Sequence, residues 1–146
     1  MKKPFTALHA RTFCHATEDL DKVKTALENT VGKLDVVVSR TEGHHGNPIT
    51  IFETRLDETK GINEFFSRLS TQDVEELLGS LGSRIDDGCN LFLRIDKQSA
   101  FMGDIKLASS DDVISVRLKV RAFPARSEVA SSIVKDYLQE LLSGRR

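Results

Sequence analysis

The sequence contains little cysteine and no long run of apolar residues, and each shortage excludes a class of protein. Only two of its 146 residues are cysteine. Cys14 and Cys89 lie far apart and form no CxxC pair, so we expect free thiols rather than a disulfide framework or a redox pair. No apolar run approaches the roughly 20 residues that cross a bilayer, and the opening MKKPFTALHARTF lacks the apolar core of a signal peptide. These absences predict a cytoplasmic protein without a membrane partner.

The sequence also lacks a strong net charge, repeats and proline-rich linkers. Its net charge of −1 does not by itself indicate nucleic acid as a partner, and its length fits a single domain over residues 1–146. The distribution of charge is more informative. Acidic residues concentrate in expected helices, such as EDLD after Thr17 and DVEE after Gln72, and basic residues concentrate in expected strands. This segregation is a first indication of a surface that binds a polyanion.

The spacing of apolar residues predicts the order of helices and strands. Apolar residues at every second position predict strands, and apolar residues spaced by about 3.6 positions predict helices. A further short strand is expected in DIKLA, and Thr17 and Thr71 are expected to cap two of the helices. The strands are expected at 7–16, 34–40, 48–56, 89–96 and 111–124, and the helices at 18–31, 62–69, 71–81 and 126–144. Strands in hairpin-like groups with helices between them predict an α+β fold of two layers, a mainly antiparallel sheet with helices on one face. The other face is free to meet solvent, and alternation requires it to be the polar one.

The polar face of this sheet is expected to carry cations. In the strand at 111–124, apolar side chains alternate with Arg117, Lys119 and Arg121, which follow one another at ~7 Å. The strand at 89–96 presents Phe92 and Arg94 on one face. Rings beside cations suit the bases and phosphates of RNA. The alternative is a solvated face whose cations oppose edge-to-edge pairing.

Arg11, Phe13 and His15 share one face of the strand at 7–16.

The stretch GHHGNP, residues 43–48, connects two apolar runs and indicates a hairpin with a connection longer than two residues. Gly43 and Gly46 permit positive φ, and Asn47 favours a turn. Backbone N–H groups of such a turn can also hold a phosphate, with the imidazoles of His44 and His45 as further donors. A turn alone and a phosphate contact both remain open.

A metal site at this stretch is not expected. Structural zinc takes four ligands, and the candidates to complete a set with the two histidines are Glu42 and His15. No GxSxG-type nucleophile elbow is present either.

The stretch DKQSAF, residues 96–101, reads as a second unusual connection. Lys97 and Gln98 follow a strand and precede no helix signal. They can reach a phosphate and a base edge, or they can be two exposed loop side chains.

Four segments of the chain resemble one family of proteins. RTFCHATED, GHHGNPI, NLFLRIDKQSAFMGDIKLA and VRLKVRAFPA are similar to segments of an archaeal RNA-binding protein family that is also described as a predicted exosome subunit. The resemblance spans roughly Leu8 to Tyr137 and implies RNA binding and a fold like that of ribosomal protein L5. It assigns no catalytic residue. The chain departs from the family pattern at two positions. Tyrosine is usual in place of Phe101, and a small apolar residue is often found in place of Cys14.

We predict a non-catalytic RNA-binding protein without cofactor or metal. The residues expected to contact RNA are Arg11, His44, His45, Asn47, Phe92, Arg94, Lys97, Gln98, Arg117, Lys119 and Arg121. The expected partners are RNA and, through the family, the exosome or other RNA-processing proteins, with a homodimer as a further possibility. Two alternatives stay open. One is an enzyme that acts on RNA or nucleotides through His44 and His45, and the other is a protein-interaction subunit without RNA affinity.

Overall fold

The computed structural model describes residues 3–33, 35–43 and 46–145. Its elements are β1 (Phe5–His15), α1 (Leu20–Val31), β2 (Val37–Glu42), β3 (Pro48–Leu56), α2 (Thr59–Ser67), α3 (Thr71–Gly79), α4 (Leu81–Arg84), β4 (Asn90–Asp96), α5 (Lys97–Phe101), β5 (Val113–Val120) and α6 (Ser127–Ser143). The strands form a five-stranded sheet in the order β2-β3-β1-β5-β4, and each neighbouring pair is antiparallel. The predicted α+β class is confirmed. None of the helices described is long and apolar enough to cross a bilayer.

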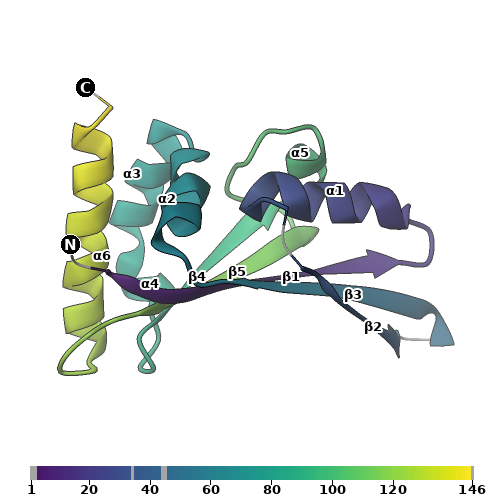
Figure 1. The fold of residues 1–146 in the computed structure, drawn as a ribbon, viewed down its shortest axis with the longest axis horizontal. Helices are drawn as coiled ribbons and strands as arrows, with labels where there is room; N and C mark the ends of the chain where they lie inside the picture. The colour runs from purple at the N-terminus through teal and green to yellow at the C-terminus, as the bar shows by residue number, and fades with distance from the viewer. Residues whose placement is uncertain (1–2, 34, 44–45, 146) are drawn as a thin grey trace.

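The helices cover one side of the sheet. Figure 1 shows α1, α2, α3 and α5 above the sheet, while α6 stands across its left end. Alternation in β1 explains this arrangement, because Leu8, Ala10 and Thr12 are buried under the helices whereas Arg11 and Phe13 are exposed. β5 alternates in the same way. The predicted two-layer arrangement is therefore confirmed, and we call the side that carries Arg11 and Phe13 the open face.

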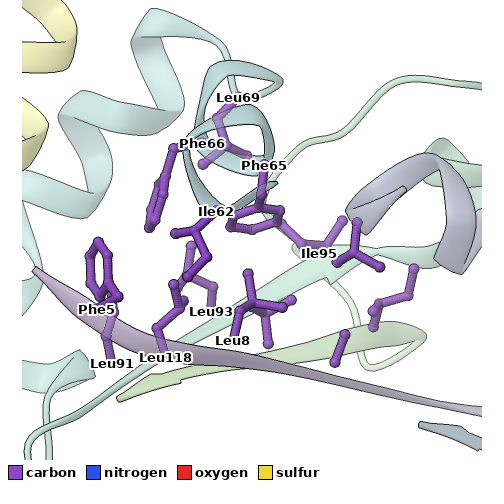
Figure 2. Packing of buried hydrophobic residues seen from close by; sticks show 14 of the residues in the cluster. Phe5, Leu8, Ile62, Phe65, Phe66, Leu69, Leu91, Leu93, Ile95 and Leu118 are labelled. Atoms are coloured by element: carbon purple, nitrogen blue, oxygen red, sulfur yellow. The ribbon is translucent and has the colours of Figure 1, made fainter. Parts of the chain in front are cut away.

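The core lies between the sheet and the helices, with buried side chains from α1, α2, α3 and α6. In Figure 2, Phe5 and Leu8 of β1 point towards Ile62, Phe65 and Phe66 of α2. The rings of Phe5 and Phe66 stack with their centroids 5.4 Å apart. Burying one side chain of this size contributes about 2–3 kcal/mol. This packing fixes α2 on the sheet and leaves the open face without a helix above it.

Several helix starts differ from the sequence prediction. α1 is capped by Asp19 rather than Thr17, because the Asp19 carboxylate accepts hydrogen bonds from two backbone N–H groups of the first turn. α3 is capped by Ser70 rather than Thr71, and α2 begins earlier than predicted, at Thr59. Asp, Ser and Thr are all good caps. Where two candidates lie close together, the sequence alone does not select one.

The two edge strands of the sheet, β4 and β2, differ in whether other segments pair with them or bury them. Along β4, single bridges join Ile85 to Leu91 and Ile95 to Leu107. The short strand expected in DIKLA is therefore present as one bridge. β2, at the other edge, is exposed along its whole length.

Candidate nucleic-acid interface

A row of basic side chains crosses the middle of the open face. His9 of β1 lies opposite Arg55 of β3 on one side and opposite Arg117 of β5 on the other. Each of the three lies between buried neighbours, so their side chains share the open face. We call Arg55, His9 and Arg117 the basic row. Among the residues that the structure describes, neither arginine forms an ion pair.

The protonation of His9 sets the charge of the basic row. Burial lowers the pKa of His9 below its ordinary value of 6.5, and the charges of Arg117 and Arg55 lower it further, while Glu53 acts in the opposite direction. His9 is therefore neutral near pH 7, between two charged guanidinium groups. An anion bound over the row would favour the protonated imidazole and offset the repulsion between these cations.

A second row runs beside the first. Arg11 lies between Glu53 of β3 and Ser115 of β5, and Ser115 lies opposite Arg94 of β4. The Arg11 guanidinium is 3.6 Å from the Glu53 carboxylate, and that of Arg94 is 3.1 Å from the Asp111 carboxylate. Both arginine side chains are about half exposed, and ion pairs in such positions contribute at most about 1 kcal/mol. A phosphate can therefore replace either carboxylate at little cost.

Two exposed rings accompany these cations. Phe92 lies opposite Arg117 and is 43% exposed. Phe13 is 39% exposed, and the Arg11 guanidinium lies 5.0 Å from the centroid of its ring. The predicted common face of Phe92, Arg94 and the basic strand is confirmed, and Arg11 lies on the same face.

The remaining predicted cations of the basic strand lie at and beyond its end. Lys119 is exposed opposite Asn90, and its ammonium donates to the carbonyl oxygen of Gly88. Arg121 follows β5 directly and is exposed, while its backbone N–H donates to the carbonyl oxygen of Pro4. Both residues extend the basic surface of β5 away from the basic row.

Lys97 is buried, which corrects the expectation that it reaches an RNA phosphate. Only 3% of it is exposed. Its ammonium lies 2.9 Å from the Glu18 carboxylate and 2.7 Å from the Asp112 carboxylate, and it donates to the carbonyl oxygen of Phe13 at 2.8 Å. A buried ammonium is tolerated only when its donors are paired in this way. Lys97 therefore ties the end of β1 to the segments before α1 and β5.

The DKQ segment is the start of a helix rather than a connection. The Asp96 carboxylate caps α5 by accepting a hydrogen bond from the Ser99 N–H at 2.9 Å. Gln98 is exposed, and its amide donates to the Asp112 carboxylate at 2.9 Å. Gln98 also lines a cavity of about 260 Å³ between α1 and α5. This cavity lies on the helix side of the sheet, so Lys97 and Gln98 do not join the basic row.

The connection between β2 and β3 forms the predicted long hairpin. The Gly43 N–H donates to the carbonyl oxygen of Asn47 at 2.7 Å, and the Gly46 N–H donates to that of Gly43 at 3.1 Å. Gly46 has a φ of +74°, which glycine adopts readily. His44 and His45 lie outside the described residues. The hairpin loop and α5 lie at the same end of the sheet, but β1 and β5 separate the strands that carry them.

Neither metal nor thiol chemistry has a site in the part of the chain that the structure describes. No group of three or more His, Cys, Asp or Glu residues there could hold a metal ion. Cys14 and Cys89 are free, as expected, and both are buried. Burial, reinforced by the charge of Glu18, raises the pKa of the Cys14 thiol. This thiol is therefore protonated at neutral pH and a poor nucleophile.

Sequence reasoning missed two members of the basic row, His9 and Arg55. A signal for Arg55 was present, since Glu53 and Arg55 alternate with less polar neighbours in PITIFETRL. The register that places Arg55 opposite His9 depends on two strands far apart in the sequence, and no local pattern reveals it.

An uncovered antiparallel sheet with cations and exposed rings is a feature shared with domains that bind nucleic acid through a sheet surface. Residues 7–120 match the model of a protein family described as RNA binding, and the chain belongs to this family.

The relatives share nearly the whole chain. An RNA-binding protein of Pyrococcus abyssi is 34% identical over 142 residues, which cover 90% of this chain and 92% of the relative. The structure of a DUF54 protein from Methanothermobacter thermautotrophicus has a TM-score of 0.80 and 33% identity, covering 93% of this chain and 99% of that one. A DUF54 protein from Sulfolobus solfataricus has a TM-score of 0.73 and 27% identity, covering 96% and 99%. The resemblance to an archaeal RNA-binding family is therefore confirmed.

Proposed function

We propose that the protein binds RNA through the open face and does not act on it as a catalyst. The observation that carries this proposal is the basic row. Arg55 and Arg117 flank a neutral His9, without a carboxylate in the row and without an ion pair among the described residues. Such an arrangement is unfavourable for the free protein and favourable for a bound polyanion. Membership of the RNA-binding family supports RNA as that polyanion.

The cations around the basic row extend the proposed contact. Arg11 and Arg94 hold exposed carboxylates that a phosphate can replace. Lys119 and Arg121 continue the surface along and beyond β5. Each phosphate neutralised releases bound counterions, so the affinity should fall steeply as salt is added.

The test reverses two of these charges. The Arg117→Glu, Lys119→Glu variant and the wild type are titrated against a fluorescent RNA over a series of salt concentrations. We expect the affinity of the variant to fall by about 10- to 100-fold at low salt, and the slope of log K against log salt to fall by about 1.4, two contacts at ~0.7 each. The melting temperature should change little because both side chains are exposed.

A matched control separates local contact from overall charge. The Lys60→Glu, Lys135→Glu variant makes the same change of net charge on α2 and α6, at two exposed positions. It should keep nearly wild-type affinity. An unchanged affinity in the Arg117→Glu, Lys119→Glu variant, or an equal loss in both variants, would refute the assignment of the open face.

The GHHGNP loop is proposed as a second contact with RNA, because it continues the β2–β3 hairpin beyond the open face. Replacing His44, His45 and Asn47 by alanine should then weaken binding without changing the salt slope, since none of these side chains is a fixed cation. The same variant tests the rival enzyme. Labelled RNA is incubated with wild type and variant, with and without a divalent cation. Cleavage by the wild type that the variant lacks would contradict the non-catalytic proposal.

Three finer expectations stay predictions: a likeness to ribosomal protein L5, association with the exosome, and a homodimer. Light scattering during size-exclusion chromatography measures the oligomeric state. Retention of the protein on an immobilised exosome, with an RNase-treated sample as control, measures association. A monomer that the exosome does not retain contradicts both of the last two expectations.

A further inference from the structure

We infer that the RNA bound by the open face is single-stranded, and that unpaired bases stack on Phe13 and Phe92. This inference rests on the proposed function and adds the class of RNA that is recognised. It starts from the two rings, because cations alone do not distinguish a single strand from a duplex.

The two rings are exposed on a face that also carries Arg11 and Arg117, together with apolar side chains of β2 and β3 such as Val37 and Ile51. Phe13 and Phe92 are 39% and 43% exposed, and both alternate with buried neighbours, which places them on the open face. Phe92 lies opposite Arg117, and the Arg11 guanidinium packs against the ring of Phe13. Each ring is therefore paired with a cation, which is the combination that binds a base together with its phosphate.

Double-stranded RNA cannot stack its bases on such rings. In double-stranded RNA the base faces are stacked inside the helix, and proteins recognise the groove shape, the 2′-hydroxyl groups and the phosphates. In a single strand the base faces are free, and stacking on an aromatic side chain strengthens binding by about tenfold or more per base. The open face therefore offers stacking contacts that only unpaired RNA can use.

The spacing of the two rings fits a short stretch of single strand. Arg117 of β5 lies opposite Phe92 on one side and opposite His9 on the other, so Phe92 and His9 are at the same height in the sheet. Phe13 lies four residues after His9 in β1. Four residues of strand and two strand spacings place the two positions about 16 Å apart along a diagonal of the sheet. That distance matches about three nucleotides of an extended strand. Ser115 lies at the middle of this diagonal. Arg11 and Arg117 lie on one side of the diagonal and Arg94 lies on the other, so cations flank the path of the phosphates between the stacked bases.

A protein-docking surface is the other use of exposed rings, and the choice of substitutions separates the two. An apolar contact with a protein tolerates leucine in place of phenylalanine. Base stacking needs a flat ring and does not. Phe13→Leu and Phe92→Leu are therefore the test variants, and Phe92→Trp is the variant that keeps a ring. Leu20→Ala serves as the control, because Leu20 is 44% exposed and starts α1 on the helix side of the sheet.

Each protein is titrated with a labelled 12-nucleotide single strand of uridine and with a 12-base-pair RNA duplex at the same salt concentration. The wild type should bind the single strand more tightly than the duplex. Each leucine variant should lose about tenfold in affinity for the single strand and keep its affinity for the duplex. Phe92→Trp and Leu20→Ala should match the wild type.

The inference is overturned if the duplex binds more tightly, or if the leucine variants keep wild-type affinity for the single strand. In either case, a loss of RNA affinity in the Arg117→Glu, Lys119→Glu variant still supports RNA binding by the open face. Leucine variants with unchanged affinity for the single strand indicate that the two rings dock a protein. Absence of binding to both RNAs by the wild type instead refutes the proposed function. The two failures therefore give different results.

Discussion

Replacing Lys97 by methionine tests whether a buried ammonium joins three parts of the fold. Methionine keeps an unbranched, flexible side chain but removes all three N–H donors. The carbonyl oxygen of Phe13 then loses this hydrogen bond, and the carboxylates of Glu18 and Asp112 face an apolar group. We expect the variant to fold, and to be clearly less stable than the wild type.

The size of the loss follows from how exposed the two partners are. Removing one member of a fully buried ion pair costs about 3–5 kcal/mol. The Glu18 and Asp112 side chains are 21% and 40% exposed, so water can solvate their carboxylates again. We therefore expect a loss of about 2–3 kcal/mol. For a chain of this length that corresponds to a fall in Tm of about 6–9 °C.

The effect should depend on pH through Asp112. Burial raises the pKa of Asp112, but hydrogen bonds from Gln98 and Lys97 and the charge of Lys97 together lower it below the ordinary value of 3.8. A carboxyl group with a lowered pKa stabilises the fold above its unfolded pKa, and this stabilisation is lost as the pH falls through the folded pKa. The difference between wild type and Lys97→Met should be complete at neutral pH and shrink below about pH 4.

Thermal unfolding followed by circular dichroism at pH 7 and pH 3 measures both effects. Lys22→Met is the control, because Lys22 is exposed on α1 and its ammonium lies 5.6 Å from the centroid of the Phe101 ring. It should lose less than about 1 kcal/mol. If Lys97→Met unfolds at the same temperature as Lys22→Met, or higher, apolar packing replaces the ammonium and the reasoning is wrong.

Two further predictions concern His9 and Ser70. Bound phosphate should raise the lowered pKa of His9, so the affinity for RNA should rise as the pH falls from 7 to 5.5. The His9→Gln substitution should abolish this rise in an anisotropy titration. A His9→Gln variant that keeps the same pH dependence would place the titrating group elsewhere. Ser70→Ala should cost about 1 kcal/mol in urea unfolding because it removes the cap of α3, whereas Thr71→Ala should cost less than about 0.5 kcal/mol. The reverse order would show that Thr71, the cap expected from the sequence, is the working one.

The faces of the central strands could be predicted from the sequence because their alternation is strict. Arg11 and Phe13 in β1, and Arg117 and Lys119 in β5, each stand between buried residues. Period-two alternation assigns such side chains to one face without any knowledge of the partner strands. This is why the polar side chains of the open face could be assigned from the sequence, whereas the register that places Phe92 opposite Arg117 comes from the structure alone.

The position of Lys97 was not within reach in the same way. A lysine after a strand is expected in solvent, and the groups that make its burial tolerable come from elsewhere in the chain, Glu18 being 79 residues away. A local signal for α5 did exist, since aspartate is a preferred N-cap residue and Asp96 accepts a hydrogen bond from the backbone N–H of Ser99. The burial itself depends on which segments meet in three dimensions, and residue spacing carries no information on that.

The strand order has a consequence for when the open face is completed during synthesis. β1 precedes the other strands in the chain, yet one of its two neighbours is β5, and the Thr12 hydroxyl bonds to the carbonyl oxygen of Val113, 101 residues later. At about 5–20 residues per second, a ribosome needs about 5–20 s to make that stretch. Throughout this interval the β5 side of β1 has no partner strand, and Arg117 is not yet made to lie beside His9. The basic row is therefore completed late, after β5 has been synthesised and has paired with β1.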